Sequence, residues 1–145
     1  MIGADDYFVC VAQTHDGCSS PAEQSAFLAT LRRNVSTILS AIRNKAHYTG
    51  QLVILNYYSL DYASTPSNAL SIGLNNAVDS GAQPFHVVVA DGFAEAKNAV
   101  VQFGGHSCEG GLLTQLGAPG HCGIHPSYAG ASLLAQAVAR VVRLR

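Results

Sequence analysis

Leu52-Val53-Ile54-Leu55-Asn56-Tyr57-Tyr58 and, further along the chain, Phe85-His86-Val87-Val88-Val89-Ala90 are the two stretches that decide the fold. Neither stretch alternates between apolar and polar residues. Such continuous apolar runs are typical of strands that are buried on both faces of a parallel sheet. We therefore predict two core strands, at residues 52–58 and 85–90.

Helical patterns lie between and outside these strands. The clearest pattern, at residues 20–45, begins with Ser20 as N-cap, Pro21 at the first helical position and Glu23 three residues after the cap. Its apolar stripe contains Leu28, Leu31, Val35, Ile38, Leu39 and Ile42. Further helices are predicted from Thr65 to about Val78, within 93–103, and from just after Ser127 to about Leu144. Residues 104–123 contain 7 glycines and are predicted to be mostly loop.

Strands that alternate with helices indicate an α/β fold with a small parallel sheet, organised as a single domain over residues 1–145. The segment Met1-Ile2-Gly3-Ala4 is interpreted as the end of a strand whose beginning precedes the chain. A sheet of so few strands has an open edge, and open edges invite pairing with another chain. We therefore expect a homodimer that forms through an exposed strand edge.

Composition excludes several classes of protein. Hydrophobic residues make up 48% and charged residues 12% of the chain, which excludes a disordered protein. The net charge of −1 gives no electrostatic basis for binding nucleic acid. No apolar run approaches the ~20 residues that a membrane span requires, and residues 1–4 do not resemble a signal peptide.

The four cysteines occur as two pairs, each flanking a loop. Cys10 and Cys18 enclose a short polar segment, while Cys108 and Cys122 enclose a glycine-rich one. We predict one local disulfide in each pair, although four cysteines allow three connectivities. Disulfides would favour an oxidising compartment. The zinc alternative rests on Cys122-x-x-His125 alone, so no metal site is assigned.

Two stretches at opposite ends of the chain resemble blocks of a known family. Ile2-Gly3-Ala4-Asp5-Asp6-Tyr7 is similar to the Gly-x-Asn-Asp block of SGNH (GDSL-type) ester hydrolases. Cys122-Gly123-Ile124-His125-Pro126-Ser127-Tyr128-Ala129-Gly130 resembles the block that carries their catalytic histidine, just before the final helix. The resemblance implies the C-terminal part of a three-layer α/β/α, flavodoxin-like fold. It also implies a small-molecule ester substrate, no cofactor, and secretion, as in the secreted actinobacterial-type members.

The resemblance assigns roles residue by residue. His125 matches the general base, which takes the proton of a nucleophilic serine. Asp5 stands where the family has its oxyanion asparagine, and an ionised carboxylate cannot donate a hydrogen bond to an oxyanion. The family's orienting acid would fall at Gly123 or Cys122, although some relatives use a backbone carbonyl instead. The family's serine block would precede Met1.

Ser107, in the stretch Gly105-His106-Ser107-Cys108, is a candidate replacement nucleophile. A disulfide from Cys108 to Cys122 would draw its loop toward His125, and a serine needs a base within hydrogen-bond reach. The alternative is an ordinary loop serine beside a disulfide.

Other residue types have both a functional and a structural interpretation. His106, His121 and His125 would form a zinc site if they converged, but loop histidines are the simpler interpretation. Asp91 follows the second strand at the edge where parallel sheets bind ligands, or it simply forms a turn. The aromatic residues that either line an acyl pocket or pack in the core are Tyr57, Tyr58, Tyr62 and Phe93.

Two hypotheses for function follow. The first is a carboxylic ester hydrolase, acting on short-chain or apolar esters, with His125 as general base. The alternative is a catalytically inactive, truncated remnant of that lineage: a folded dimeric module without the family nucleophile. Whether the chain is an enzyme stays open at this point, because the family's serine, oxyanion asparagine and acid have no clean match.

Overall fold

The computed structural model of the chain describes residues 1–118 and 120–143, and it is a mixed α/β protein. It contains a parallel pair of strands, β1 and β2, and an antiparallel pair, β3 and β4. The described residues divide into two compact units. The first comprises Met1–Leu52 and Gly73–Val87, and the second comprises Val53–Ile72 and the described residues from Val88 onward.

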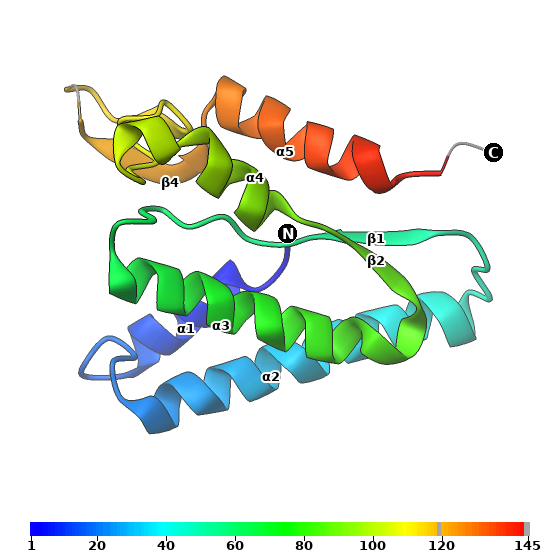
Figure 1. The fold of residues 1–145 in the computed structure, drawn as a ribbon. Helices are drawn as coiled ribbons and strands as arrows, with labels where there is room; N and C mark the ends of the chain where they lie inside the picture. The colour runs from blue at the N-terminus through cyan, green and yellow to red at the C-terminus, as the bar shows by residue number, and fades with distance from the viewer. Residues whose placement is uncertain (119, 144–145) are drawn as a thin grey trace. The chain divides into compact units, whose positions relative to one another are not determined.

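The first unit is built on helices α1 (Ala4–Gln13) and α2 (Pro21–Ser40), which lie side by side in Figure 1. The predicted cap of α2 is confirmed, because Ser20 Oγ accepts a hydrogen bond from the amide of Glu23. Phe27, Leu31, Val35 and Leu39 recur every four residues and form its buried stripe. Ile38, predicted in that stripe, is 44% exposed. A π-helical turn, η1 (Ala41–Lys45), ends the helix where the sequence predicted.

The predicted strand at residues 1–4 is wrong. Residues 1–3 have no regular structure, and α1 starts at Ala4. The backbone of Gly3 has a φ of 122°, and the amide of Tyr7 donates to its carbonyl. Asp5 and Asp6 lie in the first helical turn, where carboxylates stabilise the positive end of the helix dipole.

Helix α3 (Thr65–Ala82) extends past the predicted stop at Asp79-Ser80-Gly81 and continues into a 3-10 turn, η2 (Gln83–Phe85). The stop fails because Gly81 is a packing residue and not a helix terminator. A Cβ at this position would lie 2.5 Å from the backbone oxygen of Arg32 in α2. Glycine therefore allows α3 to approach α2 closely within the first unit.

Both core strands are shorter than predicted. Strand β1 is Leu52–Leu55, and β2 is Val87–Ala90. Asn56, directly after the first strand, donates its backbone amide to the carbonyl of Ala90 and its side-chain amide to Asp91. The second strand starts late because His86 is left-handed, with a φ of 52°, at the end of the η2 turn. Strands β1 and β2 each pair with one neighbour among the described residues.

The second unit contains α4 (Gly92–Ala99), the 3-10 turn η3 (Val101–Phe103), β3 (Leu113–Gln115), β4 (Cys122–Pro126) and α5 (Tyr128–Val141). Helices α4 and α5 lie side by side in Figure 1. The predicted final helix is confirmed, but it ends at Val141, because the backbone of Val142 is extended; the predicted end, Leu144, lies outside the described residues. The prediction of loop over 104–123 missed the β3–β4 hairpin. The core of the second unit is formed by Tyr58, Tyr62, Ala96, Val100, Leu112, Leu113 and Leu134.

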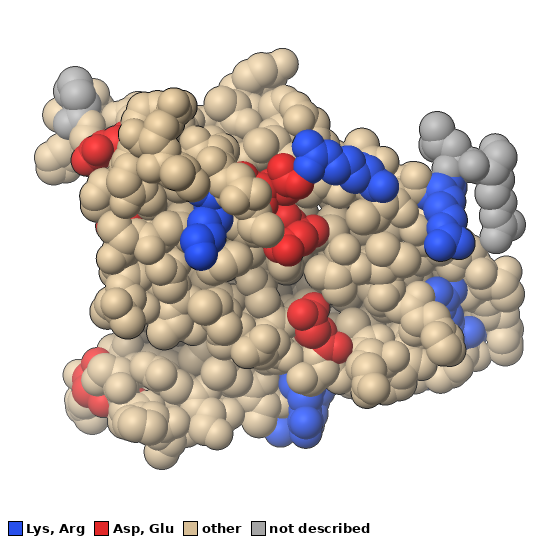
Figure 2. All heavy atoms as spheres, in the orientation of Figure 1, with Lys and Arg blue, Asp and Glu red and all other residues tan. Residues whose placement is uncertain are grey.

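The surface carries few charges. On the face shown in Figure 2, acidic and basic side chains are few and are scattered over a mostly uncharged surface, as the 12% charged composition implies. Within the described part of the chain, no helix is both long enough and apolar enough to span a bilayer.

Candidate functional site

At the carboxyl ends of β1 and β2, side chains bond to one another and to the backbone at the start of α4. The side-chain amide of Asn56 donates to Asp91 Oδ1 (3.0 Å), and Asn56 Oδ1 accepts from the amide of Phe93 (2.9 Å). Asp91 Oδ1 also accepts from the amide of Ala94, so Asp91 is the N-cap of α4. A Cβ at Gly92 would lie 2.9 Å from Leu55. The edge where parallel sheets bind ligands is therefore used here to join a helix to the sheet.

Two buried tyrosines fix the loop that follows β1. The hydroxyl of Tyr58 donates to the carbonyl of Ile124 (2.7 Å), and that of Tyr62 donates to the carbonyl of Phe93 (2.8 Å). Burial raises the pKa of each phenol to about 12. The two side chains thus act as neutral donors, and they belong to the core of this unit.

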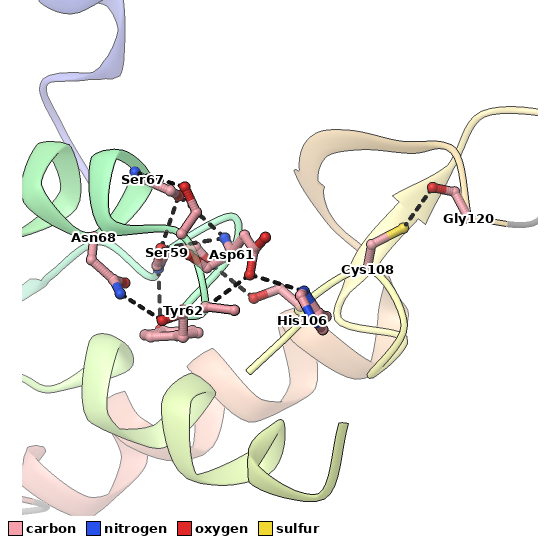
Figure 3. A network of polar contacts seen from close by, with 11 residues as sticks. Ser59, Asp61, Tyr62, Ser67, Asn68, His106, Cys108 and Gly120 are labelled. Carbon is pink, nitrogen blue, oxygen red and sulfur yellow. Dashed lines mark hydrogen bonds and ion pairs between the residues drawn. The ribbon is translucent and has the colours of Figure 1, made fainter. Parts of the chain in front are cut away.

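Figure 3 shows a contact that the sequence did not signal, between Asp61 and His106. Asp61 Oδ1 lies 3.2 Å from His106 Nδ1 and also accepts from the amide of Ala63 (2.9 Å). The two side chains are 38% and 43% exposed. A carboxylate on Nδ1 orients the ring and leaves Nε2 free to exchange a proton. The pair therefore has the arrangement of an acid–base dyad, joining residues 45 positions apart in the chain.

Ser107, the candidate replacement nucleophile, is fully buried, with 0% of its surface exposed. Its hydroxyl donates to the carbonyl of Ser59 (2.8 Å), and the amide of Tyr62 donates to the carbonyl of Gly105 (2.8 Å). These two bonds join the loop after β1 to the loop after η3. In this conformation the hydroxyl of Ser107 is committed to a backbone acceptor and has no access to a substrate.

His125, the candidate general base, lies on β4 and is exposed. The backbone on both sides of it is held in place. Tyr58 binds the carbonyl of Ile124, the hydroxyl of Thr114 binds the carbonyl of His125 itself (3.2 Å), and the amide of Ser127 donates to the carbonyl of Leu112 (2.8 Å). Ser127 then caps α5 by accepting from the amide of Gly130 (3.1 Å). No residue within 1–118 or 120–143 forms a hydrogen bond with the imidazole.

Both predicted disulfides are present. Cys10 bonds to Cys18 in the first unit, and Cys108 bonds to Cys122 in the second, where the bond ties the loop after η3 to β4. Two disulfides fit an extracellular protein. In the described part of the chain, no three His, Cys, Asp or Glu side chains are placed to share a metal ion, so the loop histidines do not converge on one.

Asp5, at the position of the family's oxyanion asparagine, lies in the first unit, whereas His125 and Ser107 lie in the second. It occupies the first turn of α1 and is exposed. The structure thus describes each of the three residues that the sequence singled out within its own unit.

No protein-family model matches this chain, and comparison with curated proteins and with solved structures gave no significant match.

Proposed function

We propose that this chain is part of an SGNH-type carboxylic ester hydrolase in which His125 is the general base. The proposal rests on the resemblance of residues 2–7 and 122–130 to the family's blocks. The observation that supports it best is an exposed imidazole on a backbone that is hydrogen-bonded at Ile124, at His125 itself and at Ser127. The imidazole is therefore accessible to substrate from a fixed point of the backbone, and a general base must lie within reach of the proton that it takes.

The surroundings of His125 favour an apolar ester. Ile124, directly before His125, is 43% exposed, and Tyr128, three residues after it, is 94% exposed, so both offer apolar surface to solvent. The stretch Cys122-Gly123-Ile124 contains no charged residue, so it would not attract a charged acyl group. Short-chain or apolar carboxylic esters are therefore the proposed substrates.

The reaction also needs a nucleophile. A serine that attacks an ester gives its proton to the base as the C–O bond forms, and the base returns that proton to the leaving alcohol. Ser107 is buried and donates to Ser59, so the proposal requires a nucleophile from outside residues 104–123.

The same observation favours the second hypothesis, a folded module without hydrolase activity. If Ser107 serves only to join two loops, none of the candidate residues in the second unit supplies a nucleophile. The two hypotheses differ in one measurable property, which is ester cleavage that depends on His125.

The experiment is hydrolysis of a short-chain nitrophenyl ester by the purified chain, comparing His125→Ala with His121→Ala. His121 is a matched control, because it is an exposed histidine in the connection between β3 and β4. The proposal expects His125→Ala to lose activity by at least ~100-fold, typical for removal of a general base, while His121→Ala retains it.

Treatment with a serine-directed phosphonate, followed by intact mass measurement, then reports whether a covalent nucleophile is present. Equal activity in the two variants would show that cleavage is not catalysed by His125. Absence of cleavage by the unmodified chain would favour the module without activity.

A further inference from the structure

Asp61 and His106 face each other from two loops of the second unit, one after β1 and one after η3 (Figure 3). Asp61 Oδ1 lies 3.2 Å from His106 Nδ1. The ester hydrolysis proposed above uses neither residue, since its base is His125. The other ring nitrogen of His106, Nε2, takes no part in the contact with the carboxylate.

Asp61 is held in place by hydrogen bonds to its backbone and to its side chain. Its amide donates to the hydroxyls of Ser67 (3.2 Å) and Ser59 (3.3 Å). Its carbonyl accepts from the amide of Ser64 (3.2 Å), and its carboxylate oxygen Oδ1 accepts from the amide of Ala63 (2.9 Å). The carboxylate is therefore fixed relative to its own backbone.

The backbone of His106 is held as well. Its amide donates to the carbonyl of Phe103 (3.1 Å), and its carbonyl accepts from the amide of Gly110 (2.9 Å). The next residue, Ser107, is buried and bonded to the carbonyl of Ser59. The two members of the pair thus start from fixed backbones, which is the preorganisation that an acid–base site requires.

The edge of the imidazole that carries Nε2 lies beside Gly104. A Cβ at Gly104 would be 3.5 Å from His106 Cδ2 and 3.8 Å from Nε2. The φ of Gly104 is 65°, in the left-handed region that favours glycine, so this position disfavours any side chain. Because the side chain of His106 is also 43% exposed, water can reach the ring.

The two loops offer apolar surface and no positive charge. Leu60, directly before Asp61, is 40% exposed, and Phe103 in η3 is 38% exposed. The sequence has no lysine or arginine at residues 56–64 or 100–118. An anionic substrate would therefore meet the negative charge of Asp61 without a compensating cation, whereas a neutral, apolar substrate would not.

We propose that Asp61 and His106 form a second hydrolytic centre, which cleaves neutral, apolar carboxylic esters with water as the nucleophile. His106 Nε2 takes one proton from the water molecule as the water oxygen bonds to the ester carbonyl carbon. The tetrahedral intermediate then breaks its C–O bond to the alcohol, and the imidazolium gives the proton to the leaving oxygen. The products are a carboxylic acid and an alcohol, and the imidazole is regenerated.

In this centre His106 is the catalytic residue and Asp61 is a positioning residue. The carboxylate keeps the proton of the neutral ring on Nδ1, so that Nε2 is the acceptor. No serine takes part, and a serine-directed phosphonate should therefore leave the reaction unchanged.

The test is hydrolysis of nitrophenyl acetate by the chain after treatment with a serine-directed phosphonate. His106→Ala is expected to lower the remaining rate by at least ~100-fold, as for removal of a general base. His121→Ala, which removes another exposed histidine, is expected to keep that rate. His125→Ala is measured beside them, because the two proposals assign the proton transfer to different histidines.

Asp61→Asn tests the positioning role, because asparagine keeps an oxygen for the amide of Ala63 but removes the charge. It is expected to lower kcat by at least ~10-fold with little change in KM. The ¹⁵N shifts of the His106 ring should show the proton on Nδ1 in the unmodified chain and on both nitrogens in Asp61→Asn. Asp16→Asn removes an equal charge from the first unit and should change neither readout.

The second centre is overturned if no cleavage remains after phosphonate treatment, or if His106→Ala cleaves as fast as His121→Ala. Cleavage that is lost in His125→Ala and kept in His106→Ala overturns it as well, while the proposed function stands. Equal loss in both variants would show one centre instead of two. A ring proton on Nε2 in the unmodified chain would contradict the role of Asp61, whatever the rates.

Discussion

Replacing Ser107 by alanine tests whether this residue is structural. The hydroxyl is fully buried and donates to the carbonyl of Ser59 at 2.8 Å. Alanine leaves that carbonyl without its donor in a site that excludes water. Two hydrogen bonds join the loop after β1 to the loop after η3, and the change removes one of them. The other, from the amide of Tyr62 to the carbonyl of Gly105, remains.

The cost follows from general values. Leaving a buried acceptor unsatisfied costs about 1–3 kcal/mol, so we expect the free energy of unfolding to fall by about 2 kcal/mol. For a chain of 145 residues this corresponds to a decrease in Tm of about 6 °C.

The assay is urea unfolding followed by far-UV circular dichroism and by tyrosine fluorescence, with two probes because the chain contains two compact units. Ser132→Ala, an exposed position in α5, is the control, and it is expected to change stability by less than about 0.5 kcal/mol. The midpoint of Ser107→Ala should fall without a change in slope.

A stability of Ser107→Ala equal to or above that of the unmodified chain would refute this reasoning. If such a variant also lost ester cleavage, Ser107 would be a nucleophile whose loop opens in solution. A loss of stability with unchanged activity would instead leave Ser107 as a residue that joins two loops.

Three further predictions concern the rest of the chain. The pKa of Tyr58 and of Tyr62 is raised by burial to about 12, so their contribution to stability is complete below about pH 10 and is lost as the pH rises from 10 to 12. Urea midpoints measured across that range should fall steeply, and a flat profile would contradict the burial of the phenols. Replacing Cys108 and Cys122 together by serine opens a loop with a sequence separation of 14 and should destabilise the second unit by about 3 kcal/mol. Thermal unfolding measures that loss, and a change in Tm of under a degree would argue against it. Finally, the homodimer through an open strand edge stays a prediction, and β1 and β2 are the strands whose edges it would use. Sedimentation equilibrium should give twice the mass of one chain, 15.1 kDa, and a monomer at all concentrations would contradict it.

The parts of the fold that the sequence determined by itself depend on residues close together in the chain. Ser20 caps α2 as predicted, and α5 starts directly after Ser127 as predicted, with Ser127 as its cap, because a cap is a hydrogen bond between residues two or three positions apart. Both disulfides formed between the cysteines that flank one loop, since short loops bring their ends together readily. His125 was placed just before the final helix, and the structure has it on the strand that precedes α5.

Tertiary structure decided whatever depends on partners far away in the sequence. Strand β1 ends at Leu55, and the side chain of the next residue, Asn56, binds Asp91, 35 residues later. Helix α3 continues through Gly81 because α2 leaves no room for a side chain there.

The same dependence governs the candidate residues. Ser107 is buried through Ser59, and His106 meets Asp61, in two contacts that span 48 and 45 residues. A local sequence pattern indicates which backbone conformation a residue favours. Burial, hydrogen-bond partners and access to solvent are properties of the packed chain. Sequence could therefore name the serine and the histidines, whereas only packing decided which of them is accessible.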